Sequence, residues 1–157
     1  MKLENAYRSV TVSRVIDAAA DLLFECHAKP EHVMKWFGPV GWPITLCEMD
    51  FRVGGAWRMA MTGEDGVQNT PFGGIFLEII PGRLISYDNA FEEPGAERMV
   101  MTFLFEPLPG GKTKLSVETT FPTASMWESH VGQGLVVGLG SALEQMEDLA
   151  IGMKGAA

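Results

Sequence analysis

The chain has 157 residues, 46% of them hydrophobic, and a formal net charge of −8 from 12 basic and 20 acidic residues. This length suits a single domain over residues 1–157, with enough chain to bury a sizeable core. The acidic balance, with no basic run, argues against nucleic acid and against an anionic membrane surface as partners. No stretch of about 20 apolar residues predicts a membrane span.

The termini and cysteines indicate where the protein resides. The N-terminus has no apolar segment of the kind found in secretory signals. Cys26 and Cys47 lack metal-ligand spacing, and His27 and His32 have no paired Cys or His at a spacing that suits a metal. We therefore expect a cytoplasmic protein with two free thiols, no metal and no cofactor.

The N-terminal quarter predicts one strand and then two short helices. The strand alternates and is rich in Val, Ser and Thr, and Pro30 ends the first helix while taking a favoured early position in the second. We place these elements at residues 7–17, 18–28 and 30–37, before a Gly/Pro loop at 38–43.

Six further strands follow, joined by turns rich in Gly and Pro. The turns are short, so consecutive strands should be antiparallel neighbours. The first of these strands carries Asp50 and Arg52 on its outward face, where they can pair. We place the strands at residues 45–53, 56–62, 72–80, 83–91, 98–106 and 112–121.

Five methionines fall at alternate positions in these strands and therefore share one sheet face. They are Met49, Met59, Met61, Met99 and Met101. Methionine is flexible and polarizable, so it suits surfaces that adapt to more than one shape, whereas a rigid core favours Leu, Ile and Val. The pattern leaves two interpretations open: an ordinary core and an adaptable apolar cavity.

The C-terminal third changes to a helical period. Apolar residues from Trp127 to Met153 recur every three or four positions and predict one long helix. Its first half carries four glycines, each costing about 1 kcal/mol relative to Ala inside a helix. Close approach of the helix to the sheet is the explanation we favour, and a mobile first half that acts as a gate is the alternative. These glycines are Gly132, Gly134, Gly138 and Gly140.

The order of elements predicts an α+β fold. A curved antiparallel sheet of six to seven strands would wrap around the long C-terminal helix, with the two short helices after the first strand. The space between helix and sheet is then the natural place for a pocket.

Several motifs carry a resemblance to a known family. They lie at residues 11–18, 30–42, 50–57, 74–79 and 110–115. On these motifs, from about residue 7 to residue 152, the chain resembles the helix-grip superfamily of START lipid-transfer domains and polyketide cyclases. Within it, the chain is similar to the bacterial family named after the activator of the heat-shock-protein ATPase.

The chain departs from that family at two places. Family members often have an aromatic residue near Cys26 and a Gly-Trp pair where this chain has Gly138-Leu139. Both departures are expected to enlarge or reshape the pocket. The resemblance implies the helix-grip fold, whereas function has to be argued from the site itself.

Few polar residues could act in such a pocket. His130 lies near the start of the predicted long helix. It is either a polar cap residue of that helix or a residue that contacts the ligand or acts as an acid or base. Glu78 interrupts an apolar strand: if it points inward, burial would raise its pKa and make it a candidate acid or base, and if outward it is ordinary surface. Tyr87 is a third candidate. Cys26 and Cys47 are interpreted as small buried hydrophobic residues.

Our leading hypothesis is binding of a hydrophobic small molecule between the C-terminal helix and the sheet. Two others remain open: stimulation of a heat-shock ATPase, as the resemblance implies, and a cyclase or hydrolase acting on an aromatic or polyketide-like compound. A homodimer is compatible with all three. The expected ligand-binding residues are Trp36, Phe37, Trp42, Met49, Trp57, Met59, Met61, Phe76, Glu78, Tyr87, Met99, Met101, Phe103, His130, Leu135 and Leu139.

Overall fold

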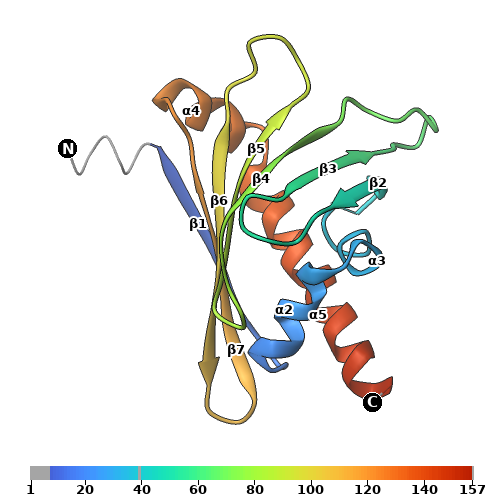
Figure 1. Ribbon diagram of the computed structural model, residues 1–157, viewed down its shortest axis with the longest axis vertical. Helices are drawn as coiled ribbons and strands as arrows, with labels where there is room; N and C mark the ends of the chain where they lie inside the picture. Colours follow the sequence, from blue (N-terminus) through green and yellow to red (C-terminus); the bar gives the residue numbers. More distant parts are fainter. Residues whose placement is uncertain (1–7, 39, 157) are drawn as a thin grey trace.

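The computed structural model describes residues 8–38 and 40–156, so residue 7 of the predicted first strand and residue 39 of the predicted loop lie outside the described part (Figure 1). It has the predicted order of a strand, two short helices, six strands and a C-terminal helical region. The elements are β1 (Ser9–Ile16), α2 (Ala20–Ala28), α3 (Pro30–Val33), β2 (Ile44–Met49), β3 (Ala56–Met61), β4 (Phe72–Ile80), β5 (Leu84–Phe91), β6 (Met99–Leu108), β7 (Lys112–Thr120), α4 (Ala124–Gly132) and α5 (Leu135–Ala156).

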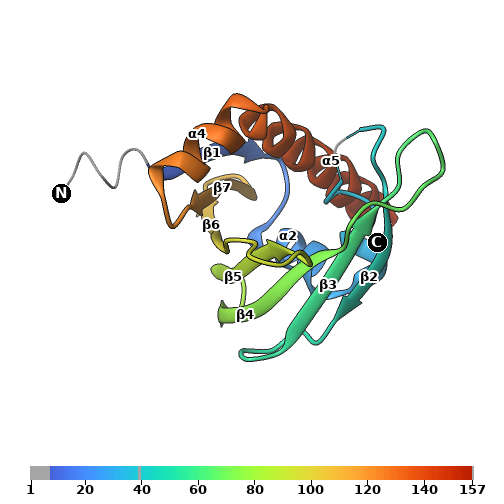
Figure 2. The same ribbon diagram turned by 90° about the horizontal axis from the view of Figure 1, so that it is seen from above.

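All seven strands form one antiparallel sheet in the order β1-β7-β6-β5-β4-β3-β2. Strands β2 to β7 therefore follow one another as neighbours, as their short turns predict, and β1 joins at the far edge against β7. Seen from above, the sheet curves around one side of the molecule and α5 runs across its concave face (Figure 2). This arrangement confirms the predicted helix-grip architecture.

The core lies between α5, α2 and the concave face of the sheet. Along α5 the buried residues recur every three or four positions, which places them on one side of the helix. They meet fully buried residues of β6 and β7 and the buried face of α2. No helix among the described residues is long and apolar enough to cross a membrane. The buried residues of α5 are Leu139, Ala142, Leu143, Met146 and Ala150.

The C-terminal region is two helices, where the sequence predicted one. Helix α4 ends at Gly132 and α5 starts at Leu135, because Gly134 has a φ of +91°, which lies outside helical geometry and favours glycine. The preferred explanation for the other glycines is also wrong. A Cβ added at Gly132, Gly138 or Gly140 would meet nothing within 4 Å, so no close approach to the sheet requires them.

Strand β2 is shorter than predicted. It ends at Met49, and the chain reverses over residues 50–55, where Gly54 has a φ of +84°. Val53, expected on the inner face, is therefore 57% exposed. The expected pairing of Arg52 with Asp50 is present, with Nε donating to Oδ2 at 2.8 Å. The two short helices are also shorter than predicted, since α2 starts at Ala20 and α3 ends at Val33.

Candidate functional site

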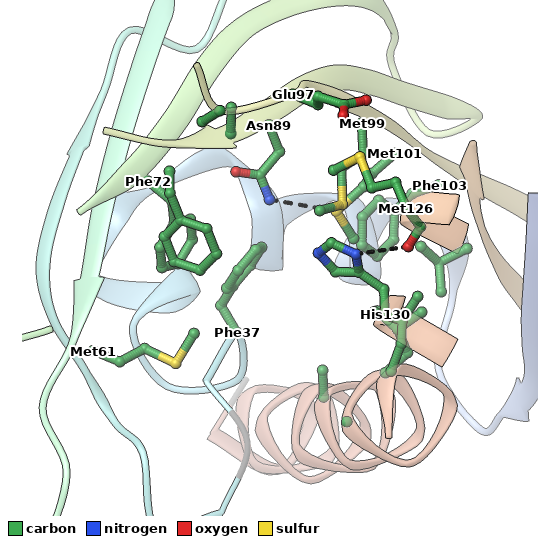
Figure 3. A pocket seen from close by; sticks show the side chains of 18 of the residues that line it. Phe37, Met61, Phe72, Asn89, Glu97, Met99, Met101, Phe103, Met126 and His130 are labelled. Atoms are coloured by element: carbon green, nitrogen blue, oxygen red, sulfur yellow. Dashed lines mark hydrogen bonds between the residues drawn. The ribbon is translucent and has the colours of Figure 1, made fainter. Parts of the chain in front are cut away.

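A cavity of about 460 Å³ lies between the concave face of the sheet and helices α4 and α5 (Figure 3). Its walls come from strands β3 to β7 on the sheet side, from α4 and α5 on the other, and from the segment after α3. Its volume falls within the range of about 300–1,000 Å³ that is usual for small-molecule sites. Side chains from segments far apart in the sequence, between Trp36 and Leu143, therefore meet around one cavity.

Aromatic rings form one side of the cavity. Trp36 is 1% exposed, and its indole Nε1 donates to the carbonyl of Cys26 at 2.7 Å, which fixes the ring against α2. Phe37 stacks on Phe72 with ring centroids 5.9 Å apart and planes 24° apart. Phe103 packs edge-on to Trp36 at 6.0 Å. These contacts make a rigid apolar wall, since each ring is held by another ring or by a buried hydrogen bond.

Methionines supply a more flexible part of the lining. Met61, Met99 and Met101 come from the sheet, and Met126 joins them from α4. Met59 is buried in the core away from the cavity, and Met49 is half-buried in the edge strand β2. The predicted methionine face is thus divided, with part of it in the core and part around the cavity.

Four polar side chains border this apolar space: Asn89, Glu93, Glu97 and His130. Asn89 is 9% exposed and points from β5 into the cavity, where its Nδ2 donates to the Met101 sulfur at 3.9 Å. His130 lies in the last turn of α4, and its Nδ1 donates to the carbonyl of Met126 at 3.0 Å. Glu93 and Glu97 are exposed in the β5–β6 loop at the rim.

The structure brings together nine of the sixteen residues expected to contact a ligand. The cavity is lined by Trp36, Phe37, Met61, Met99, Met101, Phe103, His130, Leu135 and Leu139. The other seven do not line it. They are Trp42, Met49, Trp57, Met59, Phe76, Glu78 and Tyr87.

Two of the predicted polar candidates lie elsewhere for identifiable reasons. Glu78 is exposed, because a register shift between Phe76 and Glu78 in the pairing of β4 with β5 interrupts the alternation that would have put both on one face. Tyr87 is 4% exposed and packs between Trp57 and Phe103, at 4.9 and 6.0 Å between ring centroids. Burial raises the pKa of Tyr87, and its hydroxyl has no hydrogen-bond partner among the described residues.

The two cysteines are free, as predicted. Burial, helped by a neighbouring glutamate, raises the pKa of Cys26 to about 11 and that of Cys47 to about 11. Both thiols are therefore protonated at neutral pH and are poor nucleophiles. Among the described residues, no group of three or more His, Cys, Asp or Glu side chains is placed to hold a metal ion.

Sequence reasoning missed Asn89, Phe72, Met126 and the two rim glutamates. Asn89 had a usable signal, because it shares the face of Tyr87 and Ile85 by strand alternation and is the polar member of that row. Met126 had none, since its position depends on the break between α4 and α5.

The curved sheet, the α5 helix across it and the apolar pocket between them define a helix-grip protein. Residues 17–150 match the family described as activator of Hsp90 ATPase homolog 1-like protein, and the chain belongs to that family. No curated protein matches the chain.

Solved structures of similar fold come from several bacteria. A protein from Nitrosomonas europaea has a TM-score of 0.85 and 23% identity, over 96% of this chain and 98% of its own. One from Chromobacterium violaceum has a TM-score of 0.80 and 27% identity, over 91% and 96% of the two chains. One from Arthrobacter aurescens has a TM-score of 0.84 and 23% identity, over 94% and 88%. These likenesses support the fold.

Proposed function

We propose that this protein binds a hydrophobic small molecule in the cavity between the sheet and helices α4 and α5. The observation that carries the proposal is an apolar space of about 460 Å³ lined by aromatic rings and four methionines. Burying an apolar ligand there would remove its surface from water, at roughly 25 cal/mol for each Å². The methionine side chains would let the lining adapt to the ligand's shape.

The glycine at position 138 gives a direct test. Gly138 lines the cavity, and a Cβ placed there meets nothing within 4 Å. In Gly138→Leu the new side chain should occupy cavity space and abolish binding of the neutral dye Nile red. The same change should raise the free energy of unfolding by about 1 kcal/mol, because Leu is a better helix former than Gly.

A matched control lies in the same helix. Gly152 is exposed, does not line the cavity and also has open space around it. Gly152→Leu should gain similar stability and keep Nile red binding at the wild-type level. Equal binding by both variants would contradict the proposal, as would wild-type protein that binds no dye and carries no extractable compound in native mass spectrometry.

The name of the family motivates a second function, stimulation of a heat-shock ATPase. This activity predicts a measurable rise in the ATPase rate of an Hsp90-type chaperone when the protein is added. The Gly138→Leu variant separates the two functions, since it should lose ligand binding while its outer surface is unchanged. A rate that does not change at saturating protein would remove this second function.

An enzymatic function receives less support from the geometry. Of the three residues proposed as acid or base, His130 lines the cavity, whereas Glu78 is exposed and Tyr87 is buried behind Phe103. General acid–base chemistry needs groups within hydrogen-bond reach of the same reacting atom. The three side chains do not converge on one.

A further inference from the structure

Asn89 is an unusual residue for the wall of an apolar cavity. Its side chain comes from the middle of the sheet, opposite Met99 in the pairing of β5 with β6, and points into the cavity (Figure 3). It is nine-tenths buried, and its neighbours in the wall are Phe72, Met99 and Met101. The polar amide group of Asn89 is therefore surrounded by an aromatic ring and by methionine side chains.

The hydrogen bonds of this amide are largely unmade. The Nδ2 group donates to the Met101 sulfur at 3.9 Å, which is a weak acceptor. The Oδ1 atom has no hydrogen-bond partner among the described residues and is almost fully covered, so it meets a bound molecule only when the amide turns about its last side-chain torsion. A buried acceptor without a donor is costly, and native proteins leave few of them. A group supplied by a bound molecule would remove this cost.

The other polar groups around the cavity are also acceptors. Because Nδ1 of His130 donates to the Met126 carbonyl, the other ring nitrogen of a neutral imidazole is an acceptor, and it points into the cavity. Glu93 and Glu97 place carboxylates at the rim. Within the described part of the lining there is no Lys or Arg, and nearby Arg98 donates to Gly73 and Asp88 instead.

We propose that the cavity selects hydrophobic molecules that carry a hydrogen-bond donor, such as a hydroxyl or amino group, and that Asn89 Oδ1 receives this donor. The inference rests on the proposed function and narrows it. A hydroxyl or amine satisfies the acceptors of the lining, whereas a carboxylate would meet an unpartnered oxygen and the two rim carboxylates, with no Lys or Arg in the described lining to balance its charge. Asn89 is thus a specificity residue, and anionic lipids such as fatty acids are outside the ligand class.

Three naphthalenes that differ in one substituent test the donor rule. The compounds are 2-naphthol, which donates a hydrogen bond, 2-methoxynaphthalene, which can only accept one, and 2-naphthoate, which is an anion. Each is titrated against the 157-residue protein loaded with Nile red, and dye displacement gives the affinity. Wild-type protein should bind 2-naphthol about tenfold or more tightly than 2-methoxynaphthalene, and should bind 2-naphthoate most weakly of the three.

Two variants assign the preference to one residue. In Asn89→Leu the ratio of naphthol to methoxynaphthalene affinity should fall to about one, with methoxynaphthalene binding retained. Gly152→Leu, a change at an exposed position of α5 outside the cavity, should keep the wild-type ratio. Asn89→Leu is expected to fold, since it replaces a buried amide whose oxygen has no partner with an apolar group, and circular dichroism checks this. If it does not fold, the wild-type ranking of the three compounds still decides the donor rule.

The outcomes separate the two proposals. If Nile red itself fails to bind, the proposed function fails, and the donor rule falls with it. If Nile red binds but the two neutral compounds bind equally, or neither displaces the dye, or 2-naphthoate binds best, the donor rule is overturned while the hydrophobic site stands. A naphthol preference that persists unchanged in folded Asn89→Leu overturns the role of Asn89.

Discussion

The histidine at position 27 predicts a loss of stability in mild acid. His27 is 4% exposed and is surrounded by the rings of Trp36, Phe103 and Phe105, with centroids at 4.5, 4.6 and 5.4 Å. Its Nδ1 donates to the Leu23 carbonyl at 3.3 Å, and its Nε2 has no partner among the described residues. Desolvation by burial lowers the pKa of His27 from 6.5 to about 3, against a smaller opposite effect of the Leu23 hydrogen bond.

The sign and size of the effect follow from proton linkage. The pKa of His27 is lower in the folded chain than in the unfolded chain, so the unfolded chain binds more protons between these two values. Stability is therefore complete above about pH 6.5 and falls as the pH drops toward 3. With these pKa values, protonation of the unfolded chain alone removes about 2 kcal/mol of unfolding free energy at about pH 5.

Urea unfolding of wild type and His27→Phe at about pH 7.5 and about pH 5 measures this contribution. Phenylalanine keeps an aromatic ring in the pocket and cannot titrate, so the variant should lose about 2 kcal/mol less than wild type between the two pH values. Gly152→Leu is the control, because Gly152 is exposed and the change neither adds nor removes a titratable group, so it should leave the wild-type pH dependence in place. Parallel pH dependence of wild type and His27→Phe would refute the reasoning.

Two further predictions concern the backbone and the core. Gly134→Ala should destabilise the protein by about 1–2 kcal/mol in thermal unfolding, because Gly134 has a φ of +91° that an L-residue adopts only with strain; an unchanged melting temperature would contradict this. Thr113→Val should cost about 1–2 kcal/mol in urea unfolding, since the fully buried Thr113 Oγ1 donates to the Ala18 carbonyl at 2.7 Å and Val leaves that acceptor unpaired. Thr45→Val, where the hydroxyl is exposed, is the control and should change the unfolding free energy by less than about 0.5 kcal/mol.

Much of the fold could be predicted because the signals were local. Alternating residues, short Gly/Pro turns and the change to a helical period located seven strands and the C-terminal helical region. The antiparallel order of β2 to β7 followed from the shortness of their connections. The break at Gly134 was not predicted, because glycine in a helical pattern fits a tolerated interior residue as well as a terminus.

The site was harder to predict because it depends on which inner-face residues of the sheet are covered by other side chains and which border the cavity. Trp57, Phe76 and Tyr87 share the inner face of the sheet with Met99 and Met101, and strand alternation treats all five alike. In the structure the three aromatic residues pack against one another: the ring centroid of Tyr87 lies 4.9 Å from that of Trp57 and 6.0 Å from that of Phe76. The two methionines border the cavity instead. Only the tertiary arrangement of the helices separates these two groups.

The position of the cavity follows from a difference between the two ends of the C-terminal region. In the second half of α5, Met146 and Ala150 are fully buried and complete the core. In α4, all of whose residues the structure describes, none is buried, and the helix is fixed instead by its Thr123 cap and by a hydrogen bond from Trp127 Nε1 to the Ser9 carbonyl at 2.7 Å.

The turn at Gly134 allows this difference, because a continuous helix would extend the apolar stripe of α5 in a straight line. With the break, α4 contributes Met126 and His130 to the roof of the cavity without filling it. Cavity lining therefore comes from α4 and the first half of α5, whereas Met146 and Ala150 in the second half of α5 pack in the core and do not line the cavity. It follows that changes near Gly138 can alter binding while the packing around Met146 continues to hold the helix against the sheet.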